Sequence, residues 1–151
     1  MRIVQADIAD MEILISWRIT VLREVFSLPE AVDTEALRSA NEDYYKREIP
    51  AGGHIAYFAE DEGRRVLGCG GLCIYSEMPS PDNPTGRCAY LMNVYVRPEH
   101  RGKGYGKDIV KWLVEQARSR GITKIYLESS ECAKAMYQEL GFKEMKDYFK
   151  L

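Results

Sequence analysis

Hydrophobic and polar positions along the 151-residue chain follow two periods, one typical of strands and one typical of helices. A period of two residues predicts strands at residues 1–6, 54–59, 66–75, 88–96 and 122–127, with a strand-like tail at 142–150. A period near 3.6 residues predicts helices at residues 8–26, 34–48, 105–120 and 132–140. The predicted order is therefore β-α-α-β-β-β-α-β-α-β.

Capping residues and helix breakers set the expected ends of these helices. The expected N-caps are Asp7 or Asp10 for the first helix, Asp33 or Thr34 for the second, and Ser129 or Ser130 for the last. The second helix is expected to end before Pro50, and glycines are expected to stop the later helices at Gly121 and Gly141.

The element order favours one α+β domain over residues 1–151, with a mixed sheet covered by helices. The chain shows no repeat, no low-complexity segment and no linker. At 46% hydrophobic and 29% charged residues, it can fill one core and present a polar surface.

Charge and hydropathy narrow the expected partners and location. The net charge of −2 provides no global basic field, so we expect neither a nucleic-acid partner nor a membrane partner. No apolar run reaches the roughly 18 residues of a membrane span. The first seven residues acquire charge too early for a secretory signal, so we expect a cytoplasmic location.

The four cysteines do not form a metal-binding pattern. Cys69 and Cys73 fall on the same face of a predicted strand, no CxxC occurs, and both histidines are isolated from the cysteines. We therefore expect reduced thiols and no bound metal.

The strongest chemical signal lies between the strand at 88–96 and the helix at 105–120. Three alternating glycines, Gly102, Gly104 and Gly106, fill the loop before the helix. Glycine lets the backbone approach a ligand closely, and the amides of such a turn and of a helix start bind anions. The flanking basic residues are Arg97, Arg101, Lys103 and Lys107. The segment therefore predicts a pyrophosphate site, although a solvated glycine turn stays an alternative.

Two other phosphate-binding motifs match this segment less well. A P-loop requires a glycine where this chain has Arg101, and Ser or Thr where it has Asp108. A Rossmann fingerprint requires a third glycine where this chain has Ile109, although Glu128 stands at a suitable distance. A dinucleotide-binding domain is therefore a weaker alternative.

The segment Arg101-Gly102-Lys103-Gly104-Tyr105-Gly106 resembles the R/Q-x-x-G-x-G/A signature of the GNAT acetyltransferase superfamily. The preceding Val94-Tyr95-Val96-Arg97-Pro98-Glu99 is also typical of that family. Residues 133–142, AKAMYQELGF, resemble its A-x-x-L-Y-x-x-x-G-F segment. The resemblance implies a mixed, mostly antiparallel sheet flanked by helices on both faces.

The resemblance also implies acetyl-CoA as co-substrate. The pyrophosphate would lie on the loop amides, and the pantetheine arm would bond the backbone of the preceding strand where it splays from the next. Ser130 stands where the family often has an asparagine for the pantetheine. The implied cofactor-binding residues are Val94, Val96, Arg101, Gly102, Lys103, Gly104, Tyr105, Gly106, Lys107 and Ser130.

Catalysis in this family is direct attack of a neutral amine on the thioester. By resemblance, the Val94 amide would stabilise the oxyanion and Tyr137 would be the general acid. Some members carry a catalytic glutamate where this chain has Tyr90. The general base therefore stays open among Glu77, Glu128, Glu131 and water.

The expected function is N-acetylation of a primary amine on a small molecule or a protein. A non-catalytic sensor that binds CoA or acyl-CoA is the alternative, because Tyr90 stands where some family members carry the catalytic glutamate. By resemblance, the acceptor pocket is expected to be framed by residues 17–25 and 41–45 of the first two helices and by the loop at 76–87. Asn41, Tyr44 and Tyr45 form a polar-aromatic cluster there, although tyrosines that only pack the helices stay an alternative. The sequence does not identify the acceptor. By resemblance to dimeric relatives, a homodimer is also expected.

Overall fold

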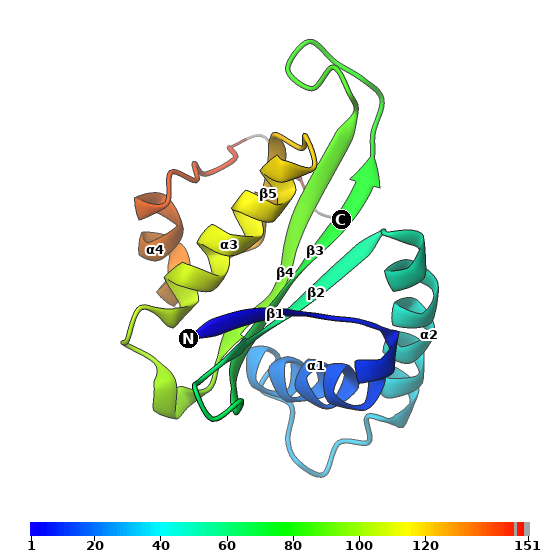
Figure 1. The fold of residues 1–151 in the computed structure, drawn as a ribbon, viewed down its shortest axis with the longest axis vertical. Coiled ribbons are helices and arrows are strands. Elements are labelled where there is room, and N and C mark those ends of the chain that lie inside the picture. The colour runs from blue at the N-terminus through cyan, green and yellow to red at the C-terminus, as the bar shows by residue number, and fades with distance from the viewer. Residues whose placement is uncertain (147, 150–151) are drawn as a thin grey trace.

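The computed structural model describes residues 1–146 and 148–149. Within this part of the chain, the strands form one sheet in the order β1-β2-β3-β4-β5 (Figure 1). Neighbouring strands are antiparallel except for the parallel pair β4 and β5, which confirms a mixed, mostly antiparallel sheet. The strands are β1 (Arg2–Ala6), β2 (His54–Glu60), β3 (Val66–Ser76), β4 (Arg87–Val96) and β5 (Lys124–Leu127).

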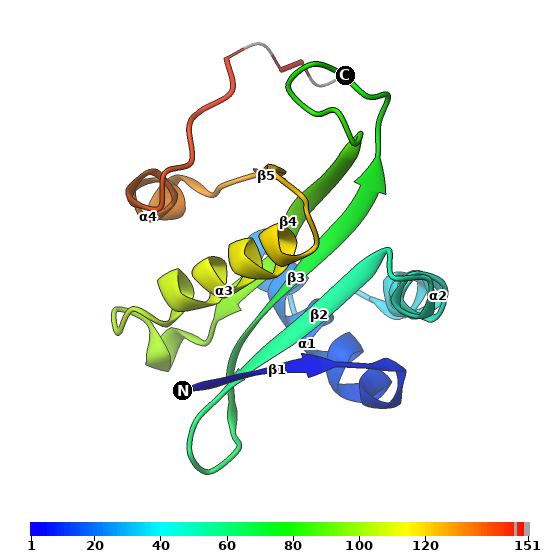
Figure 2. The same ribbon diagram turned by 45° about the horizontal axis from the view of Figure 1, so that its top comes forward.

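Helices cover both faces of the sheet, as predicted (Figure 2). One face, called the α1 face below, carries α1 (Met11–Val25) and α2 (Glu35–Ala51). The opposite face, called the α3 face, carries α3 (Tyr105–Ser119) and α4 (Lys134–Glu139). None of the helices in residues 1–146 and 148–149 has the length and hydropathy needed to cross a bilayer.

Each strand supplies both cores because its side chains alternate between the two faces. In β2, Ile55 and Tyr57 pack on the α3 face, whereas Ala56 and Phe58 pack on the α1 face. A sheet buried on both faces explains why β2 is hydrophobic along nearly its whole length.

Glycines in β3 set how closely α3 approaches the sheet. A Cβ atom at Gly70 would lie 2.9 Å from side-chain carbons of Ile109 and Leu113, and one at Gly68 would lie 3.1 Å from Ile109. The absence of side chains at these two positions lets the helix lie directly on the strand. This contact fixes the start of α3 relative to β4.

Two predicted helix caps are present as hydrogen bonds. Asp7 Oδ1 accepts from the Ala9 amide at 2.7 Å, and Asp10 Oδ2 accepts from the Asp7 amide at 2.9 Å, which forms a capping box. At α2 the bond comes from Asp33, whose Oδ1 accepts from the Glu35 amide at 2.9 Å.

Two boundary predictions are wrong. Helix α2 continues through Pro50 and ends at Ala51, and its C-cap Gly52 has a φ of +73°. Pro50 lacks the N–H that would donate to the Lys46 carbonyl, so the last turn of α2 has one hydrogen bond fewer. Neither Ser129 nor Ser130 caps a helix, since the chain enters α4 through a 3₁₀ turn whose N-cap residue, Ser130, makes no side-chain capping bond.

The predicted last strand at 142–150 is also not formed by residues 142–146 and 148–149, and residues 147 and 150 lie outside the described part. Strand β5 has only four residues, so it offers little edge for a further ladder. The tail instead makes ring contacts, with Phe142 5.7 Å from Tyr137 and Tyr148 6.3 Å from Tyr126 between centroids.

Candidate active site

Strands β4 and β5 pair over only part of their length. Their ladder runs from the pair Cys88 and Lys124 to the pair Leu91 and Leu127, where β5 ends. Strand β4 continues to Val96, so residues 92–96 have no β5 partner. The sheet therefore opens at this point and leaves a gap beside the second half of β4.

A β-bulge in β4 lies at the mouth of this gap. The register with β3 shifts between Cys69 and Gly71, and Asn93 has a left-handed φ of +57°. Met92 contacts Cys73 Sγ, and the Asn93 side chain contacts Cys69, so both consecutive side chains lie on the α1 face. This extra residue changes the direction in which the following peptide groups point.

Three peptide groups after the bulge face the gap. The Asn93 carbonyl accepts from Cys69 Sγ at 3.2 Å, so in a trans peptide the Val94 N–H points the opposite way, away from β3. The Arg97 N–H donates to Leu67 O in β3 at 3.0 Å, so the Val96 carbonyl also faces away from β3. Because alternate peptide groups of a strand point to opposite sides, the Val96 N–H faces the gap as well.

The glycine loop follows directly and forms an open surface of backbone. Gly102 and Gly104 have φ values of +75° and +85°, and a Cβ atom on either would meet nothing within 4 Å. Gly104 is the N-cap of α3, whose first amides have no partner within the helix. Gly106 is closely packed instead, since its Cβ would lie 3.6 Å from Met136 and 3.8 Å from Val96. The loop thus has the open amides that an anion requires.

Arg101 is held against α1. Its Nη2 lies 2.5 Å from Glu24 Oε1, its Nε donates to the Val96 carbonyl at 2.9 Å, and its guanidinium lies 5.2 Å from the centre of the Tyr95 ring. The Tyr95 hydroxyl also donates to Glu24 at 2.6 Å. This hydrogen bond first, and Arg101 second, lower the pKa of Glu24. Arg101 therefore tethers the loop to α1, and it occupies the Val96 carbonyl.

The other basic residues of the segment also contact the protein. Arg97 lies 4.9 Å from the centre of the Trp17 ring, Lys103 Nζ lies 3.5 Å from the Glu99 carbonyl, and Lys107 forms a 2.8 Å ion pair with Glu139. Arg97 and Lys103 are exposed, and the Lys107 side chain is 38% exposed. All three can turn toward a ligand at little cost, because exposed ion pairs contribute little.

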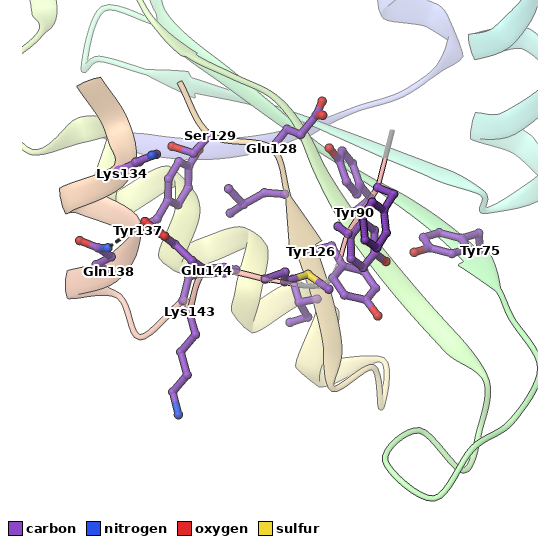
Figure 3. Close-up of a pocket in the computed structure, with 16 residues that line it drawn as sticks. Tyr75, Tyr90, Tyr126, Glu128, Ser129, Lys134, Tyr137, Gln138, Lys143 and Glu144 are labelled. Carbon is purple, nitrogen blue, oxygen red and sulfur yellow. Dashed lines mark hydrogen bonds between the residues drawn. The ribbon is translucent and has the colours of Figure 1, made fainter. Parts of the chain in front are cut away.

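A cavity of about 580 Å³ lies along β5 between α4 and the tail (Figure 3). Tyr137 lines it from α4 and Tyr90 from β4, with Glu128 and Ser129 following β5. Tyr137 is 8% exposed, and burial raises the pKa of its phenol, so it keeps its proton at neutral pH. Among the described residues, the cavity lining includes none from the glycine loop. The cavity and the gap are therefore neighbouring parts of one region rather than a single hollow.

The three candidate bases differ in their surroundings. Glu77 lies 2.5 Å from Lys124, and this contact is the main cause of its lowered pKa. Glu131 pairs with Lys134 at 2.9 Å, and its side chain is 87% exposed. Only Glu128, among these three, lines the cavity. The Ser130 hydroxyl lies 3.3 Å from Cys132 Sγ.

A polar cluster lies on the α1 face. Arg18, Asn41 and Tyr44 belong to the segments expected to frame the acceptor pocket, whereas His54 and Cys73, which also join the cluster, were not expected there. The Tyr44 hydroxyl lies 3.2 Å from His54 Nδ1 and 3.0 Å from Cys73 Sγ. No group of three or more His, Cys, Asp or Glu residues able to hold a metal occurs within residues 1–146 and 148–149.

An opened mixed sheet with a glycine loop at a helix start offers unpaired backbone groups and a helix N-terminus suited to an anion. The family model described as Acetyltransferase (GNAT) family matches residues 20–142. Since this match covers most of the chain, the chain belongs to the GNAT acetyltransferase family.

Individual relatives agree with this assignment. The chain is 33% identical over 86 residues to a glucosamine 6-phosphate N-acetyltransferase of Trypanosoma brucei brucei, covering 57% of this chain and 56% of that protein. It is 35% identical over 99 residues to an uncharacterized N-acetyltransferase of Escherichia coli K12, covering 64% and 54%. The chain thus spans about half the length of these curated relatives.

The solved structures show the same fold. A predicted acetyltransferase from Clostridium acetobutylicum, solved with acetyl-CoA, superposes with a TM-score of 0.88 over 99% of this chain and 94% of its own. The sequence identity to it is 24%, so this similarity concerns the fold.

Proposed function

We propose that this protein is an N-acetyltransferase that moves an acetyl group from acetyl-CoA to a primary amine of a small molecule or a protein. The observation that carries the proposal is the coincidence of three features at one place. The sheet opens after Leu91 and Leu127, the Asn93 bulge turns the Val94 amide into the opening, and the glycine loop begins a few residues later.

The residues around the gap fit acetyl-CoA. The open amides of residues 102–106 would hold the pyrophosphate, with Lys103 and Lys107 released from their exposed protein contacts to add charge. The Val96 N–H would bond the pantetheine, because the Val96 carbonyl already accepts from Arg101. The Ser130 hydroxyl, which caps no helix, is available for the same arm. When bound, acetyl-CoA supplies an activated thioester.

The chain's own groups would then assist acetyl transfer at the bulge. The Val94 N–H would stabilise negative charge on the carbonyl oxygen as the amine nitrogen bonds to the acetyl carbon. As the carbon–sulfur bond breaks, Tyr137 would give its proton to the sulfur and later regain one that the amine loses. The high pKa of Tyr137 suits this role because the phenol stays protonated until the thiolate forms.

The amine must lose a proton before or during attack. Of the three candidate bases, Glu128 would accept it through water, because Glu128 lines the cavity, whereas Glu77 is paired with Lys124 and Glu131 with Lys134. Water alone would serve an amine that arrives deprotonated. A Glu128→Gln variant separates these routes. The pH–rate profile of this variant should shift to higher pH only if the carboxylate takes part, because the amine must then lose its proton to water.

The Trypanosoma relative is named for an amino sugar phosphate acceptor, and its primary amine is of the class proposed here. Location in the cytoplasm and assembly as a homodimer stay predictions. Light scattering at working concentrations checks the assembly, since the monomer has a mass of 17.3 kDa and a dimer would have twice that.

The direct test of the proposal has two measurements. Calorimetry should detect binding of acetyl-CoA and CoA but not of NAD or ATP. A pooled amine screen that follows thiol release should then detect turnover. Binding without turnover of any amine would support the alternative of a CoA-binding sensor, and absence of CoA binding would contradict both.

A further inference from the structure

A half-buried arginine stands beside the bulge on the α1 face. Arg18 of α1 donates from Nε to Asn41 Oδ1 at 3.1 Å and from Nη1 to Asn93 Oδ1 at 3.1 Å. The two amides are themselves fixed, because Asn41 Nδ2 donates to the Leu37 carbonyl at 2.8 Å and Asn93 Nδ2 lies 3.6 Å from Cys69 Sγ. The guanidinium is therefore oriented by two uncharged side chains.

This cation has no counter-ion among residues 1–146 and 148–149. No Asp or Glu of residues 1–146 and 148–149 lies within 4.0 Å of the Arg18 guanidinium. Two of its five N–H groups are used, and the others have no acceptor among these residues. A partly buried charge without a partner is costly, so an arrangement that maintains one indicates a charged ligand.

The positive charge of Arg18 is not balanced by its neighbours. Burial, followed by the nearby Arg18, lowers the pKa of His54 to about 4, so His54 is neutral at physiological pH. Cys73 is also neutral there, because burial raises the pKa of its thiol. Glu48 is engaged by Arg47 at 2.7 Å. The α1 face beside the bulge therefore presents a net positive charge.

The position of Arg18 connects it to the transfer site. Asn93, which it contacts, directly precedes Val94, whose amide points into the gap. The packing between Asn93 and the sheet is closed, since the hollow between Trp17, His54 and Asn93 has a volume of about 10 Å³, at most the space of one water. Arg18 does not line this hollow and is only partly buried, so a ligand would reach its guanidinium from the solvent side.

We propose that Arg18 binds an oxyanion, a carboxylate or a phosphate, carried by the acceptor amine, so that the natural acceptor is a small anionic amine. This inference rests on the proposed acetyltransferase function. The remaining N–H groups of one guanidinium can bind an oxyanion through two parallel hydrogen bonds. The amine at the other end of the same molecule would then lie over Val94.

Matched acceptors test this proposal. Thiol release would be followed with amino acids against their amides, and with glucosamine 6-phosphate against glucosamine. The anionic member of at least one pair should have the higher kcat/KM, by roughly tenfold or more. The pair that responds distinguishes a carboxylate from a phosphate.

Two variants assign the effect to Arg18. Arg18→Gln removes the charge, and Asn41→Asp keeps the arginine but gives it a carboxylate partner in place of the amide. Both should raise KM for the anionic acceptor roughly ten- to hundredfold while leaving KM for acetyl-CoA and for the neutral acceptor unchanged. Arg118→Gln removes an equal charge on α3, behind the sheet, and should change neither.

A binding measurement separates this inference from the proposed function. Calorimetry would follow the same acceptors added to protein saturated with CoA, which cannot react. If the protein does not bind CoA, the proposed function fails. The inference is overturned if the protein binds CoA but has equal affinity for anionic and neutral amines, or binds neither. It is also overturned if Arg18→Gln changes the affinity for both amines equally, because Arg18 is then not an anion site.

Discussion

Replacing Gly104 by valine tests the glycine loop, and Gly121 provides a matched control at the other end of α3. Both glycines have a left-handed backbone, with φ of +85° and +73°, and a Cβ at either position would contact nothing within 4 Å. The cost of valine is therefore backbone strain rather than a clash, about 1–3 kcal/mol at each site. Urea unfolding should show similar losses for Gly104→Val and Gly121→Val.

Ligand binding should separate the two variants. Gly104 is the N-cap of α3, so a valine that leaves the left-handed region redirects the amides that follow it. Losing two charge-assisted hydrogen bonds to the pyrophosphate, each about 1.5–3 kcal/mol, should weaken acetyl-CoA binding at least ~100-fold. Gly121→Val should bind as the wild type does.

Calorimetric titration of both variants with acetyl-CoA and CoA is the assay, after circular dichroism confirms that they are folded. A folded Gly104→Val protein with wild-type affinity would refute the assignment of the loop. An equal loss in Gly121→Val would show that strain in α3, and not the loop amides, controls affinity.

Three further changes have expected outcomes. Tyr137→Phe keeps the ring contact with Phe142 and should bind acetyl-CoA normally, but its single-turnover thiol release should slow by about 10²–10⁴-fold. The control variant Tyr57→Phe should release thiol at the wild-type rate. A wild-type rate in Tyr137→Phe would make Tyr137 a packing residue. The pKa of His54 falls from 6.5 to about 4 on folding, so between these pH values the unfolded chain binds one proton more than the folded chain. Denaturant titrations should therefore show about 3 kcal/mol of stability lost as the pH falls from ~6.5 to ~4. The His54→Gln variant should lack this pH dependence. Lys107→Gln should weaken CoA more than pantetheine fragments without the pyrophosphate; equal loss would contradict a phosphate contact.

The glycine loop could be predicted from sequence because its determinants are local. Gly102 and Gly104 adopt the left-handed backbone that alternating glycines permit, and α3 begins directly after them. Helix positions followed from hydrophobic spacing for the same reason. Tyr137 was located by its motif, and its burial on α4 agrees with that position.

Features that depend on distant partners could not be predicted. The bulge at Asn93 arises from the register with β3, and a single asparagine in a strand does not specify it. The contact between Arg101 and Glu24 joins residues 77 positions apart. In the described part of the chain, α2 and β4 present amides rather than carboxylates to Arg18, which no local pattern reveals. The predicted last strand was wrong for a similar reason, since its pairing depended on the length of β5.

Beside the Asn93 bulge, the proposed stabilisation of the oxyanion does not depend on side-chain identity. The donor at Val94 belongs to the main chain, so replacing Val94 by any residue except proline keeps it. Deleting Met92 or Asn93 instead would remove the bulge and restore the regular pleat, with the following side chains on the faces they now occupy. Systematic alanine substitution would therefore overlook this position, and a natural relative can vary freely in residue 94 while conserving the length of its strand.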